Sequence, residues 1–169
     1  MDDSVPFGSR AYLVFLGVLL FARGMDFLST WVATPRLVLE GNPIAKRLGW
    51  KLGGGVNLLL CFLLASLPLA ALIVATTSLL VAARNFQGAW LMRTMGEHAY
   101  RAWMTERLAA GRNGLFLFCL FAQFFILGGL GAALAWWGCP LLVPLGVGLG
   151  LIGYALAVLV FTLLSLRRR

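Results

Sequence analysis

The stretch AYLVFLGVLLFARGMDFLSTWVA, residues 11–33, is long and apolar enough to cross a lipid bilayer as one helix. About 20 helical residues span the ~30 Å of hydrocarbon, and Pro35 then predicts the end of the helix. The first half of the stretch has the length of a signal-peptide core. Such a signal carries net positive charge before its core, whereas here Asp2 and Asp3 precede the single Arg10. The stretch therefore predicts a first membrane-spanning helix.

The composition of the whole chain is that of a membrane protein. Of its 169 residues, 61% are hydrophobic and 12% are charged, and the mean hydropathy is +0.91. The length fits one integral membrane domain, residues 1–169. The net charge of +8 does not indicate a nucleic-acid partner, because the basic residues lie between apolar runs instead of forming one patch. The expected anionic partner is the headgroup layer of the lipid bilayer, and no motif predicts a cofactor.

Long apolar runs predict an all-α polytopic membrane protein with four transmembrane helices, at about 11–33, 55–82, 114–137 and 141–165. Between the second and third runs, charged residues recur among good helix formers. This pattern predicts an Arg-rich amphipathic or interfacial helix at about 84–109. Its apolar residues are spread around the helix, so two alternatives are open: it packs partly on the bundle, or it extends the second span into water.

The distribution of Lys and Arg predicts the orientation. With four spans, Arg10, the arginines of 83–113 and the C-terminal arginines lie on one side and outnumber the basic residues of 36–51 on the other. We therefore expect a multi-pass membrane protein with both termini in the cytoplasm. A basic segment such as 36–51 is unusual in an outside loop.

Small residues recur at close spacing in the last two predicted spans. Gly146, Gly150 and Gly153 share a narrow face of the fourth span, and the third span contains a cluster of glycines at 128–131. Such spacing lets helix backbones approach closely. We expect these two spans to pack on each other, or to pair across a homo-oligomer through Gly146, Gly150 and Gly153.

Charged and polar residues interrupt the first span. Arg23 and Asp26 are three residues apart, and Asp26 and Thr30 are four apart, so the three side chains share one helix face and can bond to each other. An unpaired charge at the centre of a membrane helix costs about 2.5–3.5 kcal/mol. The face is therefore expected to look toward the protein interior or a water-filled cavity. It is either a buried pair that fixes helix packing or part of a binding site.

A polar turn, EGNP at residues 40–43, follows the first span. Pro43 is suited to the first position of a helix and Asn42 to its N-cap, but Glu40 has no such structural role. A return of this turn toward the polar face would create one site. The predicted binding residues, for an ion, a proton or a substrate, are Arg23, Asp26, Thr30, Glu40 and Asn42.

Asp26 and Thr30 in a first membrane helix, followed by E-x-N-P at the start of the next, resemble a widespread family of small prokaryotic membrane proteins of unknown function. The resemblance covers residues 23–60 and touches Asp26, Thr30, Glu40, Asn42 and Pro43. This chain departs from the family by two further spans and the Arg-rich middle helix. The resemblance implies a location in a prokaryotic cytoplasmic (inner) membrane and brings no mechanism with it.

A second polar cluster is predicted on the middle helix and comprises Arg84, Asn85, Arg93, Glu97 and His98. Arg93 and Glu97 are four residues apart and can pair on a solvated face. His98 is the chain's single histidine, and its neighbourhood lacks the spacing of a zinc-binding helix.

Three functions are open from the sequence. Ion, proton or small-solute binding or transport needs the polar oxygens found in the first cluster. A membrane-embedded enzyme would have to combine Asp26, Glu40 and His98, because the chain carries neither H-E-x-x-H nor G-x-S-x-G. An accessory or scaffold subunit of a membrane complex would use the paired charges for packing alone.

Overall fold

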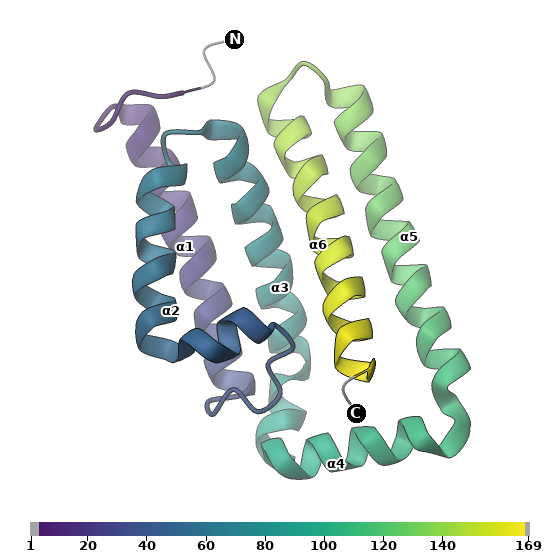
Figure 1. Ribbon diagram of the computed structural model, residues 1–169. Coiled ribbons are helices and arrows are strands. Elements are labelled where there is room, and N and C mark those ends of the chain that lie inside the picture. Colours follow the sequence, from purple (N-terminus) through teal and green to yellow (C-terminus); the bar gives the residue numbers. More distant parts are fainter. Residues whose placement is uncertain (1–3, 168–169) are drawn as a thin grey trace.

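The computed structural model describes residues 4–167, and every regular element within them is a helix. The elements are α1 (Arg10–Ala33), α2 (Pro43–Leu64), α3 (Pro68–Met95), α4 (Glu97–Arg107), a π-helical turn (Leu108–Arg112), α5 (Asn113–Gly138) and α6 (Leu142–Arg167). Among the described residues, five helices are long and apolar enough to cross a membrane. Figure 1 shows these five side by side, with α4 running across one end of the bundle, called here the α4 end.

The predicted second span, 55–82, is divided between two helices, so the structure has five candidate spans where the sequence predicted four. α2 ends at Leu64 and α3 begins at Pro68. The proline ring clashes with the carbonyl four residues earlier and removes a backbone donor, so one helix cannot continue through it. The apolar run hides this break, because its turn at 65–67 is itself mostly apolar.

α2 contains a sharp kink at Gly49, whose φ of 63° lies in the left-handed region that favours glycine. Its short first part lies across the α4 end, and its longer second part runs toward the opposite end (Figure 1). Trp50 follows the kink and donates its indole N–H to the carbonyl oxygen of Pro35 at 2.9 Å. The kink therefore holds the basic residues Lys46 and Arg47 at the α4 end.

The predicted Arg-rich helix at 84–109 is not one helix. Gly96, with a φ of 80°, separates α3 from α4. Residues 84–95 extend α3, as one of the sequence alternatives allowed, and only 97–107 cross the end of the bundle. The prediction of a single amphipathic helix was therefore wrong, because a glycine in this extended, positive-φ conformation ends α3 between two helix-forming segments.

The bundle is arranged with α3 between α1 and α6, and with α5 packed on α6 (Figure 1). The packing of α5 on α6 confirms one expectation: a Cβ added to Gly148 would lie 2.6 Å from the carbonyl oxygen of Gly131. Gly146 and Gly150 instead face α3, where an added Cβ would lie 2.6 Å from the Cβ of Leu72 and of Thr76, respectively. These two glycines therefore pack against α3 within the same chain.

Gly153 also faces α3, with the Thr77 hydroxyl 3.4 Å from an added Cβ. The face formed by Gly146, Gly150 and Gly153 therefore packs against α3 within the chain.

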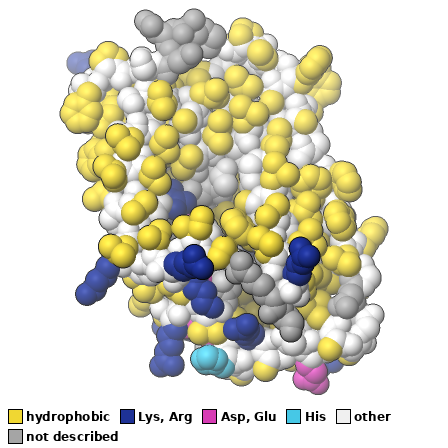
Figure 2. Space-filling view, in the orientation of Figure 1, with side chains coloured by type: hydrophobic (Ala, Val, Ile, Leu, Met, Phe, Trp, Pro, Cys, Tyr) yellow, Lys and Arg dark blue, Asp and Glu magenta, His cyan; other side chains and the backbone are white. Residues whose placement is uncertain are grey.

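The side chains divide into two zones along the bundle. Figure 2 shows hydrophobic side chains over most of the visible face and most of the visible Lys and Arg side chains toward the α4 end. α1 begins and α6 ends at opposite ends of the bundle (Figure 1). The expectation that both termini lie on one side of the membrane requires an even number of spans, whereas the described residues contain five candidate spans.

Candidate functional site

The predicted pair of Arg23 and Asp26 is confirmed. An Nη1 hydrogen of Arg23 is donated to Oδ2 of Asp26 at 2.7 Å, and the two side chains are 26% and 16% exposed. The pair lies within the transmembrane part of α1, where one partner offsets the cost of the other.

α2 and α3 add two polar partners to Arg23 that the sequence prediction did not include. Oδ1 of Asn57 accepts hydrogen bonds from Nε, at 2.8 Å, and from Nη2 of Arg23, and the hydroxyl of Ser78 accepts from Nη1 at 3.0 Å. The Asn57 amide donates to the carbonyl oxygen of Gly53 at 2.7 Å, which orients it. Arg23 therefore connects three helices. Asn57 and Ser78 could be noticed in the sequence as isolated polar residues in an apolar run. The sequence did not indicate that they bond to Arg23.

Thr30 does not bond to Asp26 among the described residues, contrary to the prediction. Its hydroxyl accepts from the amide of Asn85 at 3.1 Å, and Ser29 accepts from the same amide at 3.3 Å. The Ser29 hydroxyl in turn donates to the carbonyl oxygen of Asp26 at 2.9 Å. Asn85, predicted to belong to the second cluster, thus joins α3 to the polar face of α1.

The EGNP turn forms a compact local structure beside α6. Asn42 accepts a hydrogen bond from the N–H of Ile44 at 3.0 Å, which confirms it as the N-cap of α2. Glu40 accepts from the N–H of Asn42 at 2.7 Å, and a Cβ at Gly41 would lie 3.8 Å from Phe161 of α6.

The two halves of the predicted site are close without being joined. Among the described residues, no hydrogen bond connects this turn to Arg23, Asp26 or Thr30. Glu40 nevertheless adds a second carboxylate near the pair of Arg23 and Asp26. One guanidinium and two carboxylates therefore lie toward the α4 end of α1 and in the turn that follows it.

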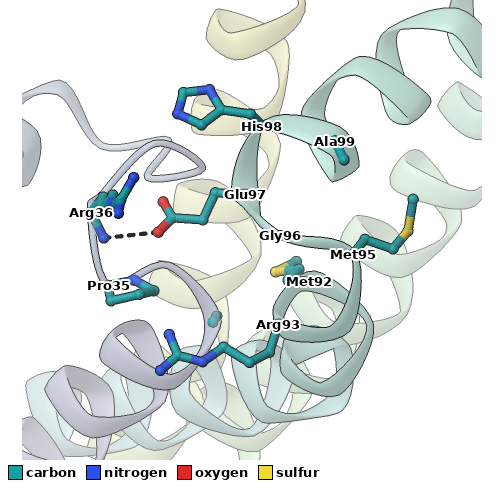
Figure 3. Close-up of a pocket in the computed structure, with 10 residues that line it drawn as sticks. Pro35, Arg36, Met92, Arg93, Met95, Gly96, Glu97, His98 and Ala99 are labelled. Carbon is teal, nitrogen blue, oxygen red and sulfur yellow. Dashed lines mark hydrogen bonds between the residues drawn. The ribbon is translucent and has the colours of Figure 1, made fainter.

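Glu97 anchors the chain segment that follows α1. Its Oε2 accepts from the Thr34 hydroxyl at 2.6 Å and from the N–H of Val38 at 3.0 Å. Its Oε1 accepts from the N–H of Arg36 at 2.9 Å (Figure 3). Thr34 also accepts from the N–H of Leu39 at 3.1 Å. The predicted Arg93–Glu97 ion pair is absent from the described part of the chain, because Gly96 ends α3 between the two residues.

The surroundings of Glu97 favour its ionised form. Partial burial acts to raise the pKa of Glu97, but the hydrogen bonds from Thr34, Arg36 and Val38, together with the positive charge of Arg36, outweigh this effect. They hold the pKa of Glu97 below its ordinary value of 4.5. Glu97 is therefore an ionised acceptor at neutral pH.

A cavity of about 500 Å³ opens beside Glu97, between the end of α1, the end of α3 and the first turn of α4. Arg36, Arg93 and His98 line it, together with apolar groups that include Met92 and Met95 (Figure 3). The guanidinium of Arg93 also lies over the ring of Trp31, 5.7 Å from its centroid. The second predicted cluster is thus divided: three members line this cavity, Asn85 faces α1, and Arg84 is exposed.

Asp26, Glu40 and His98 are not assembled into the enzyme site that the sequence left open. His98 lines the cavity at α4, whereas Asp26 bonds to Arg23 within the bundle. Within residues 4–167, no three His, Cys, Asp or Glu side chains gather closely enough to hold a metal ion.

Comparison with known proteins gives no relative for this chain: no protein-family model, no curated protein and no solved structure matches it.

Proposed function

We propose that this chain is a five-span protein of a prokaryotic cytoplasmic membrane that binds a proton at Asp26, in the cluster formed with Arg23 and Glu40. The observation that carries the proposal is the environment of Asp26: its side chain is 16% exposed within α1 and bonds, among the described residues, to a single cation, Arg23, while Glu40 adds a second carboxylate nearby. Ionised carboxylates give the cluster a net negative charge, which is costly near hydrocarbon. Uptake of one proton makes the cluster neutral.

Asp26 is the better acceptor of the two carboxylates. It lies within the transmembrane part of α1, where an ionic charge is most costly. Only Oδ2 receives a hydrogen bond among the described residues, and the side chain is 16% exposed, so Oδ1 is open to a proton. Glu40 lies in the turn and accepts from the N–H of Asn42.

Protonation would weaken the attraction between Asp26 and Arg23 and leave Arg23 bonded to Asn57 and Ser78. Asn57 and Ser78 would then be the remaining polar partners of Arg23, so proton binding would change how strongly the guanidinium is shared between Asp26 on α1 and the two other helices. This coupling fits a proton-binding or proton-coupled transport protein. The bonds of Arg23 to three helices favour a second function, in which the pair serves packing alone in an accessory subunit.

The orientation that we propose places the α4 end in the cytoplasm. Apart from Arg23 within its span, Arg10 is the only described basic residue at the opposite end. The other described basic residues lie in the 34–51 segment, in the second half of α3, in α4 and the π-helical turn after it, and at the end of α6, which supports a cytoplasmic location by the positive-inside rule. The N-terminus would then be outside and the C-terminus inside, and the basic 36–51 segment would no longer be an outside loop.

Infrared difference spectroscopy against pH tests proton binding directly. In nanodiscs, we expect a carboxylic-acid C=O band that grows as the pH falls and that loses one component in Asp26→Asn. Glu40→Gln, which removes the excess negative charge, should reduce that component at a given pH. The Asp26 component should remain in two control variants. These are Glu106→Gln, on the exposed side of α4, and Thr30→Ala, which removes the hydrogen bond between Thr30 and Asn85.

The packing function gives a different result. Asp26→Asn would then lower the thermal unfolding temperature while its infrared difference spectrum matched that of the parent protein. That pair of results would overturn the proton-binding proposal.

A further inference from the structure

We propose that the cavity at the first turn of α4 binds the phosphate group of an anionic ligand. The ligand is either the headgroup of a membrane phospholipid or a free phosphate compound from the cytoplasm. This site is separate from the cluster of Arg23 and Asp26 and does not depend on its function.

The first argument is the charge balance of the cavity wall. Glu97 is the only carboxylate among the lining residues, and both of its oxygens accept hydrogen bonds from the 34–38 segment. Arg36 and Arg93 line the same cavity, and no described hydrogen bond or ion pair uses either guanidinium. The cavity therefore keeps a net positive charge that its own carboxylate does not neutralise.

The second argument is the geometry of the donors. A guanidinium presents planar pairs of N–H groups that match phosphate oxygens. The first turn of α4 adds its backbone N–H groups, since no side chain caps this helix and Gly96, Glu97 and His98 line the cavity. A helix N-terminus favours negative charge. Arg36 belongs to the segment after α1 and Arg93 to the end of α3, and Figure 3 shows their side chains on opposite sides of Pro35, with the first turn of α4 beside Arg36.

The third argument is size and position. A cavity of about 500 Å³ lies within the range of roughly 300–1,000 Å³ found for small-molecule sites. Met92 and Met95 give it an apolar part. Trp31 and Trp90 are exposed on α1 and α3 near the same end of the bundle, as expected of tryptophans at the headgroup level. A phospholipid could place its phosphate in the cavity and its chains against the apolar helices.

Titration of the full-length protein in a neutral detergent tests the site. The probes are dioleoylphosphatidylglycerol, dioleoylphosphatidylcholine, glycerol phosphate and inorganic phosphate, with binding followed by thermophoresis. We expect saturable binding of at least one anionic probe, weakened roughly tenfold or more in Arg36→Gln/Arg93→Gln, because hydrogen bonds to charged groups are strong. The matched control is Arg101→Gln/Arg107→Gln, which removes two exposed arginines of α4 that do not line the cavity and should bind normally.

The outcomes separate the two sources and define failure. Binding of phosphatidylglycerol without the soluble phosphates assigns a lipid headgroup, and binding of the soluble phosphates assigns a free phosphate compound. Absence of binding by every anionic probe, or equal weakening in the two double variants, overturns the proposal. A photoactivatable phosphatidylglycerol analogue gives a check on the unaltered protein. If the lipid binds, its cross-links should map to the 92–99 segment, and cross-links confined to other helices overturn the lipid assignment.

Discussion

At the scale of single residues, the Arg23 side chain links three helices of the bundle. Its guanidinium bonds to Asp26 on its own helix, to Asn57 on α2 and to Ser78 on α3. α2 presents most of its second part outward, with large apolar side chains exposed at 58–60 and 62–63. The polar contact with Arg23 is therefore one of few ties that hold α2 to the rest, along with the Tyr12 hydroxyl bond to the carbonyl oxygen of Phe62 at 3.1 Å.

Removing the guanidinium alone should destabilise the protein more than removing both charges. We expect Arg23→Leu to cost roughly 2.5–3.5 kcal/mol, the cost of an unpaired charge within a membrane helix. Asp26 would lose its ion-pair partner, and Asn57 and Ser78 would lose a donor. Arg23→Leu/Asp26→Leu should recover most of this loss. Unfolding in mixed micelles measures the loss of stability in the single and in the double variant. Arg10→Leu, which removes an arginine at the opposite end of the bundle, is the control. Equal losses in the single and double variants would contradict a charge-based role.

The hydrogen bonds of Glu97 predict a pH dependence. Because its pKa is held below the ordinary value of 4.5, its contribution to stability is complete above that value and is lost as the pH falls through the lowered folded-state value. At neutral pH, Glu97→Gln should speed hydrogen exchange at the N–H groups of Arg36 and Val38 by roughly tenfold or more. Glu106→Gln is the matched control on α4. Unchanged protection in Glu97→Gln would mean that other contacts hold the segment.

At the scale of elements, the sequence predicted helices well where polar or helix-breaking residues bound them. α1, α5 and α6 lie close to the predicted 11–33, 114–137 and 141–165. The division of 55–82 was missed because Pro68 lies in an unbroken apolar run and the first turns of α2 carry Lys46 and Arg47. The contact of Arg23 with Asn57 could not be predicted, since spacing along one helix says nothing of which other helix it meets.

The break between α3 and α4 depends on the backbone of Gly96. Its φ of 80° and ψ of 149° are almost confined to glycine, and a side chain there costs about 1–3 kcal/mol. Gly96→Ala should therefore lower stability by about that amount and release Glu97 from the 34–38 segment, with faster hydrogen exchange at Val38. Gly17→Ala is the control, because an added Cβ there meets no atom within 4 Å and should be neutral or stabilising.

At the scale of the whole molecule, the odd number of candidate spans agrees with the gathering of basic residues at the α4 end. Both favour an orientation in which that end is cytoplasmic. The four-span prediction left the basic segment 36–51 outside, against the positive-inside rule. Dividing 55–82 into two spans moves that segment to the same end as α4 and the end of α6. The proposed orientation thus removes the one feature of the sequence that the four-span topology did not explain.

Cysteine labelling in intact cells distinguishes the two topologies. Four spans place residue 46 outside and residue 4 inside, whereas five spans with a cytoplasmic α4 end reverse both. In a Cys61→Ala/Cys119→Ala background, we expect Lys46→Cys to react with a membrane-impermeant maleimide only after permeabilisation, and Ser4→Cys to react in intact cells. Cys139, exposed in the turn between α5 and α6, is outside in both topologies, so every chain carries one label in intact cells and the reaction of residue 4 or 46 is read as a second label. Labelling of residue 46 in intact cells, with residue 4 protected, would contradict the proposed orientation and restore the four-span arrangement.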